Sequence, residues 1–211
     1  MEFAYSALEK IIFNEASTEV LPRLLCGLSY KRPFVVVSRT LAEKTGDLSA
    51  LRQALPVELA GFYKAIRSHT PREDALELLD QVRESGADVI ISVGGGSVID
   101  AGKFVQLAIA QGLKHESEIL QYAQQGNGSK GAKHGDFRLF SSTDKIRQLA
   151  IPTTLSGAEF SNSAGVLNSS SGSKESYRGP RLCPQAIVYD PELAGYTPSW
   201  LWLSTAIRSL D

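Results

Sequence analysis

The sequence predicts an α/β protein with a Rossmann-like, mainly parallel sheet flanked by helices. Short β-branched runs such as Pro33–Ser38 and Asp88–Val93 are apolar throughout, as strands buried on both faces of a sheet are. Between such runs the apolar residues recur at helical spacing, so strand and helix alternate along the chain. This alternation produces βαβ units and therefore parallel strands.

The first third of the chain opens the alternation. The expected elements are, in order, a strand at Lys10–Asn14, a helix at Thr18–Leu28, a strand at Pro33–Ser38, a helix at Ala42–Leu55 that ends before Pro56, and a strand at Leu59–Tyr63.

The next helix has start and stop signals of its own. Thr70 is expected to be its N-cap, with Pro71 at the first helical position and Glu73 completing a capping box. Gly86 is expected to end it.

The rest of the chain continues the pattern. The expected elements are a strand at Asp88–Val93, a helix at Val98–Gln111, a mobile loop at Gln124–Gly135, strands at Gln148–Pro152 and Ala186–Tyr189, and a final helix from Pro198 that the sequence truncates at Asp211.

Composition excludes several classes of function. The 22 basic and 23 acidic residues nearly cancel, so nothing favours nucleic acid or an anionic membrane as a partner. No apolar run is long enough to span a bilayer, and the N-terminus lacks the pattern of a secretory signal. The two cysteines, Cys26 and Cys183, lie far apart without metal-binding spacing, which favours reduced thiols in a cytoplasmic protein.

A glycine run is the first candidate site. Gly94, Gly95, Gly96 and Ser97 follow the clearest strand and precede a helix. Glycines let the backbone approach a ligand closely, and a helix N-terminus attracts anions, so the loop suits a pyrophosphate. Ser97 is expected to serve as both N-cap and phosphate donor. The alternative is a tight turn that binds nothing, since the loop fits neither GxGxxG nor a Walker A motif.

A hydroxyl-rich segment is the second candidate. Thr153, Thr154 and Ser156 follow another strand, where their hydroxyls suit a ribose, a phosphate or a carboxamide. An ordinary hydroxyl-rich turn is the alternative.

Four segments together resemble the iron-containing alcohol dehydrogenase family, within the dehydroquinate-synthase-like superfamily. These segments are HTP at 69–71, GGGSVIDAGK at 94–103, IPTTLSGAE at 151–159 and PQAIVYDPEL at 184–193. The shorter form PTTLSGAE resembles the maleylacetate reductase branch.

The resemblance implies roles for individual residues. Gly95, Gly96 and Ser97 match the loop that holds the cofactor pyrophosphate, and Asp100 matches an acidic residue near the cofactor. The other matches are Thr153 and Thr154, which contact the dinucleotide near its adenosine side, Ser161, which faces the nicotinamide ribose, and Lys174, which lies near the cofactor ribose unless it is a solvated loop lysine.

This chain departs from the family pattern at the end of the second strand. NAD-preferring members often have an aspartate there, whereas this chain has Ser38 and Arg39. A basic residue suits a 2′-phosphate, so NADP is favoured over NAD. A surface arginine without a ligand is the alternative.

The second departure concerns the family metal, iron or zinc. Arg208 occupies the position of the first metal-binding aspartate, and Asp211 falls just before a histidine that the chain lacks. His69, His115 and His134 show no ligand spacing. We therefore expect no metal ligands in this chain; the maleylacetate reductase branch works without a metal.

These matches predict an NAD(P)-binding domain at residues 1–195, followed at 196–211 by the start of a truncated helical domain. The expected function is that of an NAD(P)-dependent alcohol dehydrogenase, or a carbonyl or maleylacetate reductase, acting on a small alcohol, aldehyde or keto acid. The alternatives are a non-catalytic nucleotide-binding remnant or truncated pseudoenzyme, and a lyase of the dehydroquinate-synthase type. We expect the chain alone to be weakly active or inactive and, because Trp200–Leu203 is apolar, to self-associate as a homo-oligomer.

Overall fold

A six-stranded parallel sheet forms the centre of the molecule. The computed structural model describes residues 7–125, 146–179 and 181–207. Every pairing in the large sheet is parallel, and the strand order is β1-β9-β6-β4-β2-β3. The strands are Lys10–Phe13 (β1), Pro33–Ser38 (β2), Gly61–Ile66 (β3), Val89–Gly94 (β4), Arg147–Pro152 (β6) and Ala186–Tyr189 (β9). The predicted fold class is confirmed.

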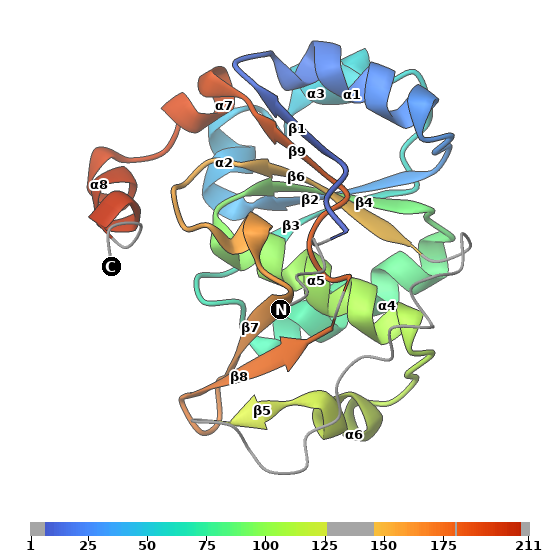
Figure 1. Ribbon diagram of the computed structural model, residues 1–211, viewed down its shortest axis with the longest axis vertical. Coiled ribbons are helices and arrows are strands. Elements are labelled where there is room, and N and C mark those ends of the chain that lie inside the picture. Colours follow the sequence, from blue (N-terminus) through green and yellow to red (C-terminus); the bar gives the residue numbers. More distant parts are fainter. Residues whose placement is uncertain (1–6, 126–145, 180, 208–211) are drawn as a thin grey trace, which may run out of the picture.

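Helices cover both faces of this sheet (Figure 1). On one face pack Ser17–Gly27 (α1), Arg39–Lys44 (α2) and Ser49–Ala54 (α3), and on the other pack Arg72–Ser85 (α4) and Gly96–Ala110 (α5). The remaining helical segments are Glu116–Ile119 (α6), Leu120–Tyr122 (η1), Ala158–Phe160 (η3), Pro191–Gly195 (α7) and Ser199–Ile207 (α8).

A small antiparallel sheet forms a further layer that the sequence did not predict. It consists of Gln124–Gln125 (β5), Ser163–Asn168 (β7) and Ser173–Arg178 (β8), in the order β5-β8-β7. The first two residues of the expected loop Gln124–Gly135 therefore form a strand, so that prediction is wrong for them; the rest of that segment lies outside the described residues.

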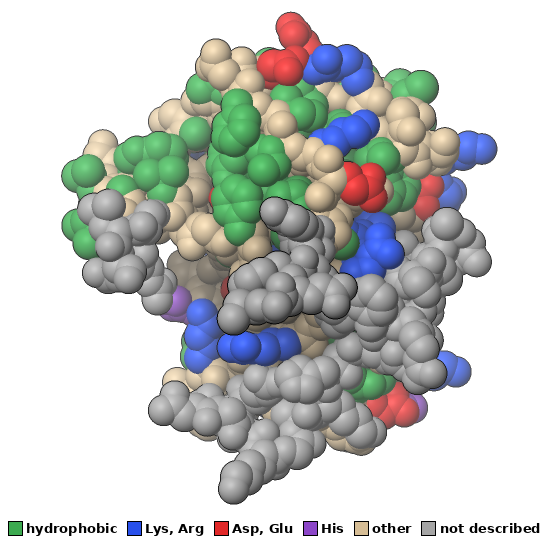
Figure 2. Space-filling view, in the orientation of Figure 1, with side chains coloured by type: hydrophobic (Ala, Val, Ile, Leu, Met, Phe, Trp, Pro, Cys, Tyr) green, Lys and Arg blue, Asp and Glu red, His purple; other side chains and the backbone are tan. Residues whose placement is uncertain are grey.

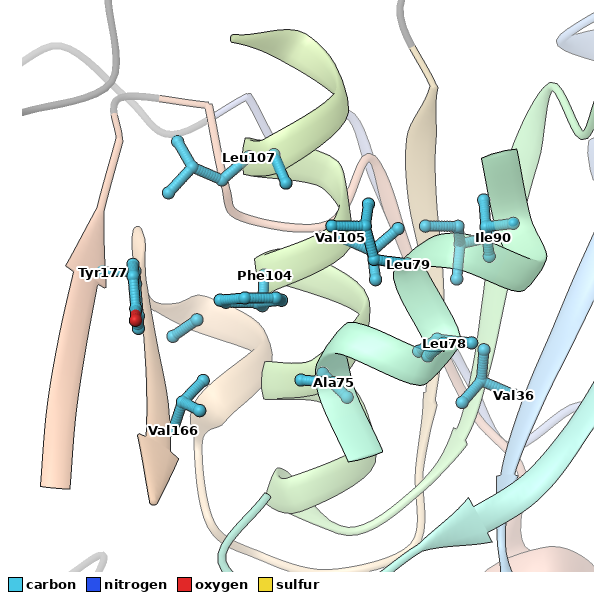
Figure 3. Close-up of a cluster of buried hydrophobic side chains, with 14 of the residues drawn as sticks. Val36, Ala75, Leu78, Leu79, Ile90, Phe104, Val105, Leu107, Val166 and Tyr177 are labelled. Carbon is cyan, nitrogen blue, oxygen red and sulfur yellow. The ribbon is translucent and has the colours of Figure 1, made fainter. Parts of the chain in front are cut away.

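Helix α5 lies between the two sheets. Its apolar residues contact both the large sheet and the β7–β8 hairpin, as Figure 3 shows for Phe104 and Val105. The Phe104 ring meets the edge of Tyr177 on β8 with 5.1 Å between ring centroids. The start of α5 is thereby held firmly relative to the strands beside it.

The prediction of a single helix over Ala42–Leu55 is wrong. The chain forms α2 and α3 instead, separated by Gly46, Asp47 and Leu48, whose φ angles are 57°, 56° and 55°. Three consecutive left-handed residues cannot continue a right-handed helix. The expected strand Leu59–Tyr63 exists as β3, but it begins and ends later in the chain.

The expected cap of α4 is also wrong. Pro71 is the N-cap and Arg72 the first helical residue, and no side chain caps the helix. The Thr70 hydroxyl donates instead to the Ser97 carbonyl, so a long-range partner replaces the local one. Gly86 ends the helix in the left-handed conformation, as expected.

The parallel sheet gathers the candidate residues at one edge. β4 and β6 run in register, with Gly94 opposite Pro152, so the glycine loop and the threonine pair leave the sheet side by side. β2 lies on the other side of β4 and delivers Ser38 and Arg39 to the same edge. No helix within the described ranges is long and apolar enough to cross a membrane.

Gly102 tests how tightly α5 packs on the sheet. A Cβ at Gly102 would meet Ser92 Oγ at 2.5 Å and would also clash with the Gln148 amide. Overpacking costs about 1–3 kcal/mol, which exceeds the gain of about 1 kcal/mol in helix propensity. We expect Gly102→Ala to lower the free energy of unfolding in urea by about 1–2 kcal/mol.

Gly27 at the end of α1 provides the matched control, because a Cβ there would meet nothing within 4 Å. Gly27→Ala should leave the stability unchanged or raise it slightly. A Gly102→Ala variant as stable as the unmodified chain would contradict the packing described for α5.

Candidate functional site

The glycine loop connects β4 directly to α5. Gly94 has a φ of 150°, which side-chain-bearing residues rarely adopt. Gly95 is the N-cap of α5, and a Cβ there would lie 3.1 Å from Thr154 Cγ2. A Cβ on Gly96 would lie 2.9 Å from Ser156 Oγ. The missing side chains therefore let the loop lie directly against the Thr154 and Ser156 side chains at the positive end of the α5 dipole, and this arrangement is called the glycine cradle below.

Ser97 lies inside α5 and is not its N-cap, so that part of the prediction is wrong. The N-cap position belongs to Gly95 because the Gly95 carbonyl accepts the first helical N–H groups, those of Val98 and Ile99. The Ser97 hydroxyl oxygen instead accepts the backbone N–H of His69 at 2.9 Å.

The threonine pair lies beside the loop. Thr153 donates its backbone N–H to the Gly94 carbonyl at 3.0 Å, which joins the two segments. Thr154 is only 5% exposed, and its hydroxyl oxygen has no hydrogen-bond partner among the described residues. This hydroxyl lies against Gly95, at 3.3 Å from a Cβ built there. A buried polar atom without a partner is costly and marks a place where a ligand is expected.

Asp100, near the N-terminal end of α5, joins this helix to the hairpin. Its carboxylate accepts the backbone N–H of Gly165 at 3.0 Å and lies 3.7 Å from the Lys103 amine. Burial raises the pKa of the Asp100 carboxyl, while the positive charges of Lys103 and Lys174 act in the opposite direction. The Lys174 side chain passes over Gly165, whose missing Cβ would lie 2.7 Å from the Lys174 amine. Lys174 is thus brought close to Asp100.

Lys103 supports the candidate site from inside the protein, which the sequence analysis did not predict. It is fully buried, and its amine donates to the Ala158 carbonyl, to Ser161 Oγ at 2.9 Å and to the Ser163 carbonyl at 2.9 Å. Burial lowers the pKa of the Lys103 ammonium group, which the charge of Asp100 partly offsets. The signal in the sequence was a lysine inside the mainly apolar helix that follows the loop.

Ser161 is therefore engaged within the protein. Its hydroxyl accepts from Lys103 and lies 3.1 Å from both the Ala158 and the Ser163 carbonyls. Its expected place facing a nicotinamide ribose stays a prediction.

Arg39 lies at the carboxyl end of β2, where it begins α2 with an exposed side chain. The preceding Ser38 caps α2, because its hydroxyl oxygen accepts the Leu41 N–H at 3.4 Å. The sequence thus has Ser38 and Arg39, and no aspartate, at this strand end.

An apolar pocket of about 240 Å³ opens on the other side of the threonine pair. Its walls include Phe13, Leu155, Tyr189 and Trp202, and Thr154 forms part of its lining. The Phe13 and Tyr189 rings are stacked with 5.1 Å between centroids. Figure 2 shows hydrophobic side chains gathered on this face over α7, α8 and the neighbouring β1–β9 edge. Local sequence patterns do not reveal this pocket, because its walls come from segments that are distant in the chain.

Metal ligands do not gather in the part of the chain that the structure describes. No three His, Cys, Asp or Glu side chains there form a group that could hold a metal ion. Arg208, Asp211 and His134, on which the metal prediction partly rested, lie outside the described residues. Within the described ranges, the side chains therefore do not fit the family's metal.

Comparison with known proteins identifies the family. The family sequence model for iron-containing alcohol dehydrogenases matches residues 9–191 of this chain. The chain belongs to the iron-containing alcohol dehydrogenase family. Dehydrogenase FUM7 of Gibberella moniliformis is 35% identical over 189 residues, which cover 87% of this chain and 43% of that protein. Maleylacetate reductase of Rhizobium sp. is 25% identical over 209 residues, which cover 99% of this chain and 48% of the reductase.

Solved structures of the family share this fold. Sulfoacetaldehyde reductase from Bifidobacterium kashiwanohense in complex with NAD+ matches with a TM-score of 0.78 at 19% identity, over 98% of this chain and 51% of the reductase. The chain thus spans about half the length of the family members that it matches. The motifs quoted from the sequence predicted this family correctly.

Replacing Lys103 tests how much its buried contacts stabilise the protein beneath the site. Lys103→Met leaves three oxygen atoms of the 158–163 segment and the Asp100 carboxylate without their cationic partner. Removing one member of a buried charged network costs about 3–5 kcal/mol. We expect a loss of about 2–4 kcal/mol in the free energy of unfolding, measured in urea, because Asp100 keeps some solvent contact.

Lys64 is the matched control. It pairs with Asp47 at 2.7 Å, but both side chains are exposed. Lys64→Met should change stability by less than about 1 kcal/mol. Equal effects of the two substitutions would show that the buried network contributes nothing beyond an ordinary surface pair.

Proposed function

We propose that this chain is the dinucleotide-binding part of an NAD(P)-dependent oxidoreductase that passes a hydride between the cofactor and an alcohol or carbonyl compound. Such chemistry belongs to the nicotinamide ring, which supplies or accepts the hydride when the cofactor is bound. The protein's own residues bind and orient that cofactor.

The unpartnered Thr154 hydroxyl beside the glycine cradle is the observation that carries the proposal. The cradle and the N-terminus of α5 suit a pyrophosphate, for which Gly94–Ser97 supply backbone N–H groups and the Ser97 hydroxyl. A ligand at that place lies within reach of Thr154 and completes its hydrogen bonding. The residues present therefore fit a dinucleotide.

The two ends of the dinucleotide fit the two sides of the loop. The apolar pocket beside Thr154 suits the adenine ring, since aromatic and aliphatic side chains form its walls. Asp100 and Lys174 lie on the hairpin side of α5, where we propose that they act near the nicotinamide ribose. Along the chain, Ser161 lies between the threonine pair and Lys174.

We propose NADP as the preferred cofactor. Arg39 stands exposed at the carboxyl end of β2, and Ser38 is occupied as the cap of α2. An arginine there attracts a 2′-phosphate, whereas an aspartate would bind the ribose 2′-hydroxyl of NAD.

We propose a small alcohol, aldehyde or keto acid as the substrate. Relatives named for the reduction of maleylacetate and sulfoacetaldehyde support an acidic carbonyl compound. We also propose association with a second copy through α8, since Trp200, Leu203 and Ile207 are each more than 60% exposed.

Gly95→Val tests the pyrophosphate site. Valine would press on Thr154 and fill the cradle, so we expect the affinity for NADPH, followed by its fluorescence, to fall at least about tenfold, or about 1.4 kcal/mol. Gly27→Val, on the far end of α1, should bind NADPH normally. A folded Gly95→Val variant with unchanged affinity would place the cofactor elsewhere.

Arg39→Asp tests the cofactor preference. Losing a charge-assisted hydrogen bond and gaining a like charge should weaken NADPH binding by about 1–3 kcal/mol. NADH lacks the 2′-phosphate and is the internal control, so its affinity should hold or improve. Tighter binding of NADH than of NADPH by the unmodified chain would show that Arg39 does not recognise a phosphate.

A further inference from the structure

A strained turn lies against the glycine loop. His69 and Thr70 follow β3 and have φ angles of 65° and 55°. Left-handed backbone is uncommon outside glycine, and a β-branched residue such as threonine is an outlier there. Strain of this kind persists only where surrounding contacts hold it, and it gathers at functional sites.

The contacts that hold the turn converge on Ser97. The His69 N–H donates to Ser97 Oγ at 2.9 Å, and the Thr70 hydroxyl donates to the Ser97 carbonyl at 2.9 Å. On the other side, the Thr70 carbonyl accepts the Leu167 N–H of β7 at 2.9 Å. Thr70 is 1% exposed, so its hydroxyl is enclosed and committed to Ser97.

These contacts decide how the Ser97 hydroxyl can bind a ligand. A backbone N–H can only donate, so Ser97 Oγ must act as the acceptor toward His69. The hydroxyl proton of Ser97 then points elsewhere, and no acceptor for it exists among the described residues. Ser97 is therefore held ready to donate, which is the polarity that a phosphate oxygen requires.

We propose that the His69–Thr70 turn is a positioning element that fixes Ser97 as a hydrogen-bond donor to the cofactor pyrophosphate. The inference rests on the proposed function, since it assumes that a dinucleotide occupies the glycine loop. Thr70 acts through Ser97 and does not touch the ligand. If Thr70 had only a structural role, its replacement would lower stability, and any loss of NADPH affinity would be the same with or without the Ser97 hydroxyl.

A double-mutant cycle separates the two roles. The variants are Thr70→Val, which removes the hydroxyl at constant shape, Ser97→Ala, and the two combined. The measurements are the NADPH affinity by fluorescence titration and the stability in urea. We expect each single variant to bind NADPH roughly five- to tenfold more weakly, in proportion to one hydrogen bond.

The combined variant decides the case. Once Ser97 has lost its hydroxyl, Thr70→Val should weaken NADPH binding by less than about twofold more, because coupled residues are not additive. Thr70→Ser keeps the hydroxyl and should bind within about twofold of the unmodified chain. An equal loss in both backgrounds, or unchanged affinity in Thr70→Val, overturns the proposal.

If Thr70→Val fails to fold, Thr70→Ala removes the same hydroxyl without a branched side chain, and Thr70→Ser remains its matched control.

The failure of the proposed function and the failure of this inference give different results. An unmodified chain that binds neither NADPH nor NADH overturns the proposed function and this inference with it. A chain that binds NADPH equally well with and without the Thr70 hydroxyl overturns this inference alone.

Discussion

The burial of helix α5 between two sheets is the constraint on which the rest of the structure depends. A helix enclosed on both sides keeps little solvated surface, so the buried polar side chains along it need partners inside the protein. Lys103 finds its acceptors in the 158–163 segment, and the Gln106 amide donates to the Arg181 carbonyl at 3.0 Å. These partners draw segments distant in the sequence toward the helix. The glycine loop, as the start of the same helix, is fixed by the same contacts.

A fixed loop matters because anion binding by backbone groups depends on their being in place beforehand. Ordering a flexible loop when the ligand arrives would subtract from the binding free energy. Here Thr153 is hydrogen-bonded to Gly94, and His69 and Thr70 are hydrogen-bonded to Ser97. The loop is therefore held by the segment that follows β6 and by the segment that follows β3. The free-energy cost of holding the loop in one conformation falls on folding instead of on binding. Part of this cost is the left-handed backbone at His69 and Thr70.

The sequence predicted what depends on local pattern and missed what depends on distant partners. Strands β2 and β4 can be predicted from their β-branched runs, because strands buried on both faces are apolar throughout. The hairpin was missed because β8 buries a charged residue, Glu175, where an apolar one is expected. Its partner Arg72 lies 103 residues earlier, at a Nη1–Oε1 distance of 2.7 Å, and no local rule connects them.

The errors at Thr70 and Ser97 have the same physical origin. Both residues have hydroxyls suited to capping the helix beside them, and local propensity alone would assign them that task. The fold instead places them opposite one another, where the Thr70 hydroxyl satisfies the Ser97 carbonyl and leaves α4 without a side-chain cap. A long-range contact prevails because the strand order brings the end of β3 to the start of α5.

The hairpin is consequently part of the site. Three contacts attach it: Glu175 pairs with Arg72 at the start of α4, Leu167 bonds to Thr70 at the strained turn, and Gly165 bonds to Asp100 near the N-terminal end of α5. All three attachments reach the elements that surround the glycine loop. A loop of the same sequence without these contacts would keep its glycines but lose the contacts that hold Ser97 and the approach of Lys174 to Asp100. The proposed binding site therefore depends on the tertiary arrangement of the loop, the turn and the hairpin, and not on the glycine loop alone.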